Sequence, residues 1–371
     1  VTNDHHAGQT ALHRMGAACN CGIRMEDPKF FKAQWIVKTD LKFEATKAHE
    51  GPVLLYPYIY FTTTPDTHEK PSAEIWRINL DTKKRELVRS MDKANMANGM
   101  VLCPPKPTES KTVIGSFFTC EQGHNKGMKA RISKTTIHQD GTHTYEVIVE
   151  ENGKDINFNS PNDIAVAPDH AIWFTDPTYG SIQGFRPNPP KAPNSIYRID
   201  PETKEVKRVV DLGGDKDGKG CKPNGLCFSG DGKTLYFTDT MLDDRSIYGI
   251  PLNKKGDDVA PGAEPEHVVR VLPADPESDN AIPDGLKWVD GLLVTSCGPN
   301  LAFIDPVKKQ RLGDFELGDH FESVTNFALS ADGDLLAVVG GGTVAILGRK
   351  YDKPRLPAFP KAEVDMRPAR N

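Results

Sequence analysis

The chain has 371 residues, of which 37% are hydrophobic and 26% are charged, and its formal net charge is −5. This acidic balance argues against a nucleic-acid partner, because phosphate binding requires a basic face. No apolar run reaches the roughly 20 residues of a membrane-spanning helix, so we expect a globular protein without a membrane partner.

Six copies of one pattern follow one another along the chain. Each copy has a polar lead residue, a short apolar strand, a polar turn and a second apolar strand. The copies occupy residues 50–61, 98–118, 162–176, 224–239, 284–296 and 326–339. The lead residues are 42 to 64 residues apart. This spacing is typical of propeller blades, which take roughly 40–50 residues plus their loops.

Further strand signals lie between the copies. Ile75–Leu80 precedes a polar turn, and Ser195–Asp200 and Val206–Asp211 flank another. These hairpins predict the third and fourth strands of a blade, and no long amphipathic helix is evident. The sequence therefore predicts an all-β fold, a six-bladed β-propeller with a central metal site.

The repeats divide the chain into three predicted parts. Residues 1–44 are expected to form an N-terminal arm, with the option of closing the propeller, and residues 45–348 form the propeller itself. Residues 349–371 are rich in proline and charge and predict a C-terminal tail.

Cysteine usage and glycosylation signals bear on location. The seven cysteines lack the spacing of a zinc site, even though Cys19 and Cys21 form a Cys-x-Cys pair, so we expect buried or free thiols. The absence of an Asn-x-Ser/Thr sequon favours the cytoplasm, while a start at Val1 keeps a processed, secreted form open. We expect a monomer or a weak homo-oligomer.

Every lead residue carries a side-chain oxygen. The six are Glu50, Asn98, Asn162, Asn224, Asp284 and Asn326. Because the first strand of each propeller blade lines the central channel, these oxygens are expected to converge at one mouth. Buried carboxylates require a compensating cation, and calcium takes about 6–8 oxygen ligands. The predicted ligands of one divalent cation, calcium, are Glu50, Asn162, Asn224 and Asp284.

A local explanation competes with this one, because Asn-Gly and Asp-Gly are also good turn pairs. It accounts for Asp231-Gly232, which falls between two strands. It accounts less well for Asn224 and Asp284, which precede a strand at a repeated offset, and not at all for Glu50. For Asn98 and Asn326 both explanations stay open.

Aspartate also recurs at the end of the second strand, at Asp176 and Asp239. Repetition at that place predicts a turn or strand cap rather than a catalytic group.

Several of these segments resemble the gluconolactonase/regucalcin (senescence marker protein) family. The matching segments are His49–Val53, Ser160–Ile164, Trp173–Gly180, Pro223–Leu226 and Pro283–Leu286. The run Tyr179–Pro189 is similar to the fungal lactonohydrolase branch in particular. The motifs stand in the family's order over about residues 45–348.

The resemblance implies a six-bladed propeller that holds one divalent ion, usually calcium, above the channel. The family's metal-binding glutamate, asparagine and aspartate correspond to Glu50, Asn224 and Asp284. Asn162 matches the asparagine that lies beside metal and substrate. Regucalcin-type members carry an arginine two residues before that asparagine, where this chain has Ser160, and this departure leaves the substrate open.

The resulting prediction is a calcium-dependent hydrolase of carboxylic ester bonds that opens a small-molecule lactone with metal-activated water. Asp284 is the predicted base, and Asn162 is predicted to orient the lactone. The predicted substrate contacts are Asn98, Ser160, Tyr179 and His49. His49 and His124 are alternative bases, because histidine titrates near neutral pH, although a surface or structural role competes for each.

Other functions stay open on the sequence alone. A metal-propeller esterase or phosphotriesterase would use the same ion, and so would an enzyme that opens or closes a ring in a specialised metabolite. A non-catalytic calcium-binding propeller is a further alternative, since a fold does not imply a function.

Overall fold

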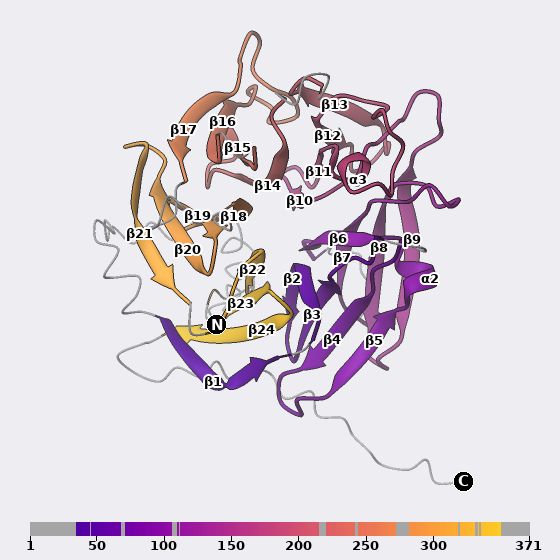
Figure 1. Ribbon diagram of the computed structural model, residues 1–371, viewed down its shortest axis with the longest axis vertical. Helices are drawn as coiled ribbons and strands as arrows, with labels where there is room; N and C mark the ends of the chain where they lie inside the picture. The colour runs from indigo at the N-terminus through magenta and orange to yellow at the C-terminus, as the bar shows by residue number, and fades with distance from the viewer. Residues whose placement is uncertain are drawn as a thin grey trace, which may run out of the picture.

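The computed structural model describes residues 35–349 apart from 45, 68–70, 106–109, 111, 215–219, 242–243, 272–281, 318–319, 331–332 and 334. These residues form six four-stranded antiparallel sheets arranged in a ring (Figure 1). The predicted all-β, six-bladed propeller is therefore confirmed. The predicted tail and most of the predicted arm lie outside the described residues.

The first three blades are meanders in which consecutive strands pair. Blade one contains β2 (Ala48–Leu55), β3 (Tyr58–Thr63), β4 (Ile75–Asn79) and β5 (Arg85–Arg89). Blade two contains β6 (Ala97–Leu102), β7 (Val113–Glu121), β8 (Arg131–His138) and β9 (His143–Glu150). Blade three contains β10 (Ile164–Val166), β11 (Ile172–Asp176), β12 (Ser195–Ile199) and β13 (Val206–Asp211).

The last three blades include the closure of the ring. Blade four contains β14 (Pro223–Phe228), β15 (Thr234–Asp239), β16 (Ser246–Pro251) and β17 (Glu266–Arg270). Blade five contains β18 (Pro283–Val289), β19 (Leu292–Cys297), β20 (Asn300–Asp305) and β21 (Gln310–Glu316). Blade six contains β22 (Asn326–Leu329), β23 (Leu335–Gly340), β24 (Thr343–Arg349) and β1 (Trp35–Phe43). Because β1 pairs antiparallel with β24, this sheet joins the two ends of the described chain.

The place of a strand within its blade is reflected in the burial of its residues. The second strands β11 and β19 are buried along their whole length, because neighbouring blades cover both faces. The outermost strand β5 alternates between exposed and partly buried residues. Continuous burial therefore marks an inner strand, and alternating burial marks an outer one.

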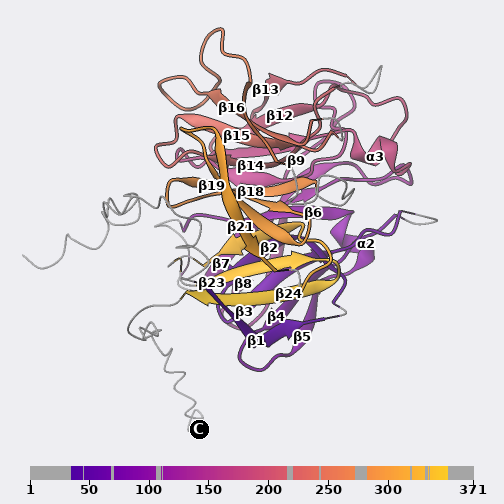
Figure 2. The ribbon, with the colours of Figure 1, turned by 60° about the vertical axis from the view of Figure 1, so that its left-hand side comes forward.

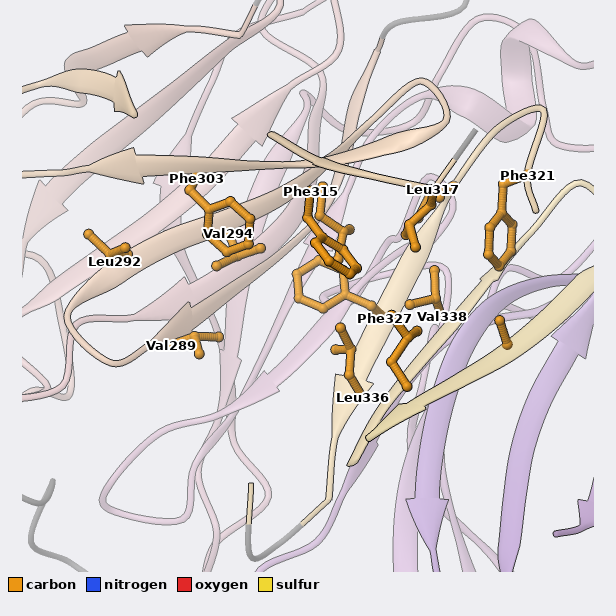
Figure 3. Close-up of a cluster of buried hydrophobic side chains, with 14 residues drawn as sticks. Val289, Leu292, Val294, Phe303, Phe315, Leu317, Phe321, Phe327, Leu336 and Val338 are labelled. Carbon is orange, nitrogen blue, oxygen red and sulfur yellow. The ribbon is translucent and has the colours of Figure 1, made fainter. Parts of the chain in front are cut away.

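The hydrophobic core lies between adjacent blades. Figure 3 shows the cluster between blades five and six, where Phe303 and Phe315 lie beside Phe327 and Leu336. Burying a side chain as large as Phe327 contributes about 2 kcal/mol. The described residues contain six such clusters, one at each contact between neighbouring blades. The ring is thus held together by burial at every interface.

Two four-residue helices, α2 (Met91–Ala94) and α3 (Tyr179–Ile182), lie on the same side of the ring in Figure 2. The first precedes an innermost strand and the second follows β11, so both belong to loops at the mouth where the innermost strands begin. Neither helix of the described chain is long and apolar enough to cross a membrane.

Turns and thiols agree with the sequence. Gly232, between β14 and β15, has a φ of 69°, which glycine adopts without strain from a Cβ. The cysteines in the described part of the chain take part in no disulfide, and they are Cys103, Cys120, Cys221, Cys227 and Cys297. Cys19 and Cys21 lie outside it.

Candidate active site

The six lead residues occupy equivalent places, at or near the start of the innermost strands, or just before it. These strands surround the centre of the ring (Figure 1). Asn162 lies two residues before β10, and the others lie within their strands. Asp284 is partly exposed and the other five are buried. The structure therefore brings together the predicted set Glu50, Asn98, Asn162, Asn224, Asp284 and Asn326.

Two carboxyl groups approach each other across this mouth. Glu50 of blade one and Asp284 of blade five lie within hydrogen-bonding reach of each other. The pKa of Glu50 is raised to about 7, mainly by burial and then by the charge of Asp163. Burial also raises the pKa of Asp284 well above its usual range, and Glu50 adds to that shift. Both groups can be ionised together only beside a compensating positive charge.

A third carboxylate and a lysine complete the polar lining of the channel, and the sequence reasoning missed both. Asp163 is 2% exposed, and its Oδ2 lies 3.6 Å from Lys287 Nζ. A signal was present, because Asp163 stands where glycine follows four other lead residues. When all are ionised, Glu50, Asp284 and Asp163 together with Lys287 leave two net negative charges.

Glycine follows those four lead residues for a packing reason. The glycines are Gly51, Gly99, Gly225 and Gly285. A Cβ on Gly225 would lie 2.3 Å from the backbone oxygen of Asp284, and one on Gly285 would lie 2.3 Å from Asn326 Oδ1. Each glycine lets its strand approach the lead residue of the next blade closely. The Asn-Gly and Asp-Gly pairs here lie within β14 and β18, which rejects the turn explanation for them.

Threonines at the ends of second strands hold the backbone of the lead residues. Thr175 Oγ1 donates to the carbonyl oxygen of Asn224 at 2.8 Å. In the next blade, Thr238 Oγ1 donates to the carbonyl oxygen of Asp284 at 2.9 Å. The Thr-Asp pairs that end β11 and β15 therefore position the lead residue of the following blade.

The aspartates of the same pairs cap the loops that enter the innermost strands, as the sequence predicts. Asp176 accepts hydrogen bonds from the N–H groups of Asn159 and Ser160, each at 2.8 Å. Asp239 accepts one from the N–H of Lys222 at 2.9 Å. Burial raises the pKa of Asp176 to about 7. These carboxylates therefore support the loops and do not face the mouth.

The blade-three loop has a second buried anchor in Arg186. Its guanidinium forms an ion pair with Glu151 at 2.8 Å and donates to the carbonyl oxygen of Asn159 at 2.6 Å. This contact and the Asp176 cap hold the segment leading to Asn162 from both sides.

Ser160 faces the protein interior. It is fully buried, and its hydroxyl donates to the carbonyl oxygen of Pro177 at 2.6 Å and accepts from the N–H of Gly180 at 3.0 Å. This geometry gives no support to the prediction that Ser160 contacts substrate. Its hydroxyl instead holds the start of α3, because both of its partners flank Tyr179.

Tyr179 lies within electrostatic range of Asp284. Its hydroxyl forms a hydrogen bond with the hydroxyl of Thr240, a residue that the sequence reasoning did not consider. Its pKa is raised by burial and also by the negative charge of Asp284. The role of Tyr179 as a substrate contact stays a prediction.

The two histidines differ in position. His49 lies at an irregularity in the pairing of β2 and is partly buried, and burial lowers its pKa to about 4. It is therefore neutral near pH 7 and lies next to Glu50. His124 lies in the loop after β7, where its Nδ1 accepts a hydrogen bond from the N–H of Lys126 at 3.1 Å. That contact favours the structural role for His124.

The remaining lead asparagines have different surroundings. Asn326 Nδ2 donates to Glu50 Oε2 at 2.8 Å, and its Oδ1 accepts from the N–H of Phe327 at 2.9 Å, so it orients the glutamate. Asn98 Oδ1 is buried without a hydrogen-bond partner among the described residues. A buried acceptor of this kind calls for an ion, water or ligand.

The donor chemistry of the mouth suits an oxygen-seeking divalent cation. No group of three or more His, Cys, Asp or Glu side chains within the described ranges is arranged to hold a metal ion. A metal here would depend on amide oxygens as well as on Glu50 and Asp284, which calcium accepts and zinc disfavours. The residues present therefore fit calcium.

Comparison with known proteins identifies one family. The family model for the SMP-30/Gluconolactonase/LRE-like region matches residues 106–298, just over half of the chain. Lactonohydrolase oryL of Aspergillus oryzae (strain ATCC 42149 / RIB 40) is 29% identical over 203 residues, covering 51% of this chain and 44% of the relative. The Gluconolactonase of Zymomonas mobilis is 29% identical over 111 residues, covering 29% of each protein. The chain thus spans less than half the length of these curated relatives.

Solved structures show the same fold. A gluconolactonase from Xanthomonas campestris aligns with a TM-score of 0.59 at 20% identity, covering 85% of this chain and 94% of that one. The calcium-binding protein regucalcin from Agrobacterium tumefaciens strain C58 aligns with a TM-score of 0.55 at 16% identity, with the same coverage. At these identities the likeness concerns the propeller alone.

Proposed function

Because this chain belongs to the SMP-30/gluconolactonase/LRE-like family, we propose that it is a hydrolase that opens a small-molecule lactone. Curated relatives bear the names lactonohydrolase and gluconolactonase, which supports this reaction class. The observation that carries the proposal is the meeting of Glu50 and Asp284 at one mouth of the channel, with the Tyr179 hydroxyl close by.

The proposal includes one divalent cation, calcium, at this mouth. Glu50, Asn162, Asn224 and Asp284 would hold it, because they supply two carboxylates and two amide oxygens in an oxygen-only set. When bound, the cation would polarise the lactone carbonyl and stabilise negative charge on its oxygen.

The chain's own residues supply the proton transfers. Asp284, partly exposed at the mouth, accepts a proton from the attacking water. The C–O ester bond then breaks, and the same proton passes to the ring oxygen as it leaves. One water is consumed, and the product is a hydroxycarboxylate.

Two further side chains are proposed to hold the lactone. Asn162, at the end of the loop anchored by Asp176, offers an amide that can hydrogen-bond the ring. Tyr179 offers a hydroxyl within electrostatic range of Asp284, and this hydroxyl is proposed to orient the leaving oxygen. Their shared role is orientation, which lowers the barrier by limiting unproductive poses.

The test is a hydrolysis panel of aldonolactones, aromatic lactones, aryl esters and phosphotriesters, with chelator and with calcium added back. We expect turnover of at least one lactone that chelator abolishes and calcium restores. Turnover of aryl esters or phosphotriesters without any lactone turnover would contradict the proposal, as would full activity in chelator.

Substitution of Asp284 tests whether this residue both binds the metal and acts as the base. Asp284→Ala is expected to lose both calcium binding and about 1,000-fold or more of kcat/KM, because a ligand and the base disappear together. Asp231→Ala is the matched control, since Asp231 lies in the exposed turn between β14 and β15 and contacts only that turn. Retention of metal and activity in Asp284→Ala would refute the site assignment.

A further inference from the structure

The channel contains an ion pair that the proposed reaction does not use. Lys287 belongs to β18 of blade five, and its Nζ lies 3.6 Å from Asp163 Oδ2, next to β10 of blade three. Blade four lies between these two blades in the ring (Figure 1), so the pair joins innermost segments that are not neighbours. The lysine therefore reaches a blade that is not adjacent to its own.

Asp163 depends on this contact. Its Oδ1 accepts a hydrogen bond from the N–H of Ile164 at 2.9 Å, and its buried Oδ2 has no hydrogen-bond partner within the described part of the chain. Lys287 is thus the cation that compensates Asp163, because a buried carboxylate without one is costly.

Both members of the pair act electrostatically on the candidate cation site. The negative charge of Asp163 raises the pKa of Glu50 and of Asp284, and the positive charge of Lys287 lowers both. Lys287 Nζ also lies 5.9 Å from the centre of the Phe327 ring on β22. Residues of blades one, three, five and six therefore share one electrostatic environment.

We propose that Lys287 is a built-in counter-cation that holds the channel at two net negative charges and so matches the site to a divalent cation. The inference rests on the proposed function in one respect, because it concerns the same cation site. Three carboxylates, Glu50, Asp284 and Asp163, face one ammonium group. Without that ammonium the channel carries three negative charges, which match a trivalent ion.

A purely structural ion pair would behave differently. Its removal would lower stability and leave the charge preference of the site unchanged, because a structural bridge acts through folding alone. The relative affinity for ions of different charge is therefore the decisive readout, and it needs no lactone.

The experiment measures Ca²⁺ and Tb³⁺ binding to the full chain, by calorimetry for Ca²⁺ and by competition with terbium luminescence for Tb³⁺. These ions are similar in size and differ by one charge. In Lys287→Met the ratio of Tb³⁺ affinity to Ca²⁺ affinity should rise about tenfold or more, because the trivalent ion gains more from the lost positive charge. Lys287→Arg keeps the charge and should keep the ratio within about twofold of the wild type.

Substitution of Asp163, the partner of Lys287, provides the matched comparison. Asp163→Asn should lower the ratio of Tb³⁺ affinity to Ca²⁺ affinity. The double variant Asp163→Asn with Lys287→Met should restore the wild-type ratio, because one negative and one positive charge are removed together. This comparison also keeps the proposal testable if Lys287→Met does not fold. An unchanged ratio in folded Lys287→Met, or in Asp163→Asn, would overturn the inference.

Wild-type binding separates this inference from the proposed function. If the wild type binds Ca²⁺ and Asp284→Ala does not, the site stands, and the Lys287 variants decide the inference alone. If the wild type binds no Ca²⁺, the metal part of the proposed function is overturned and the inference is overturned with it.

Discussion

Blades three and four share one backbone plan and differ in the side chains that they bring to the mouth. In both, the second strand ends in Thr-Asp, and the aspartate caps the loop that enters the innermost strand. Two residues before the lead asparagine, blade three has the buried Ser160 and blade four has the partly exposed Lys222. One residue after it, blade three has Asp163 and blade four has Gly225.

This difference shows where the propeller departs from its own symmetry. The shared Thr-Asp pairs build equivalent loops, because their hydrogen bonds go to backbone groups that every blade possesses. Asp163 adds a charge that Lys287 of another blade compensates. Departures from the repeat are therefore the places where site-specific chemistry enters a symmetric scaffold.

The largest expected effect comes from the buried carboxyl group of blade three. The pKa of Asp176 is raised from 3.8 to about 7 in the folded chain, so the folded state keeps a proton that the unfolded state releases. Its stabilising contribution is complete below about pH 4 and is lost as the pH rises through about 7, by up to roughly 4 kcal/mol. Melting temperatures against pH, in chelator, should therefore show a smaller fall in Asp176→Asn than in the wild type.

Glu50 is the companion group for this measurement. Its pKa is also raised to about 7, so its contribution has the same sign and is lost over the same pH range. Glu50→Gln should likewise reduce the fall in melting temperature as the pH rises. Parallel curves for the wild type and both variants would show that these carboxyl groups are not protonated in the folded state.

Gly225→Ala tests the close approach of β14 in blade four to the Asp284 backbone in blade five. A Cβ at this position would lie 2.3 Å from the backbone oxygen of Asp284, so the strands must separate, and we expect a loss of about 2 kcal/mol. Urea unfolding measures it. Gly214→Ala is the control, because no atom of the described residues lies within 4 Å of its added Cβ. A loss equal to that of Gly225→Ala would contradict the packing explanation.

Asn326 tests whether a lead residue of another blade acts through Glu50. Asn326→Ala removes the 2.8 Å hydrogen bond that orients the glutamate, and we expect calcium affinity to fall about tenfold. Calorimetry on the folded variant checks this. An unchanged calcium affinity would place Asn326 among the purely structural residues.

The smallest expected effects compare Ser160 with Lys222, the residues two positions before the lead asparagines of blades three and four. Ser160→Ala leaves the N–H of Gly180 without its acceptor and should cost about 1 kcal/mol, with lower lactone turnover because Tyr179 shifts. Lys222→Met should leave stability within about 0.5 kcal/mol of the wild type, because that side chain is partly exposed. Thermal unfolding and kcat/KM measured together compare the two, and equal effects would remove the distinction drawn between these blades.

Much of the fold could be predicted because its signals are local. The apolar run Leu292–Val294, directly after the turn residues Asp290 and Gly291, identifies the second strand of a blade from the sequence alone. The repeat of lead residues gave the blade number and placed Glu50 and Asp284 at the same level of the ring. Their roles in binding metal and in catalysis stay predictions.

The sequence by itself determined the six repeats, the first two strands of each blade and the oxygen-bearing residue of each blade, because these depend on neighbours in the chain. Only the tertiary structure decided that Asp163 meets Lys287 and that the Ser160 hydroxyl faces the protein interior. It also decided that Gly225 serves close packing and not a turn. The physical reason is that burial, charge compensation and steric fit arise between blades, where residues far apart in the sequence come into contact.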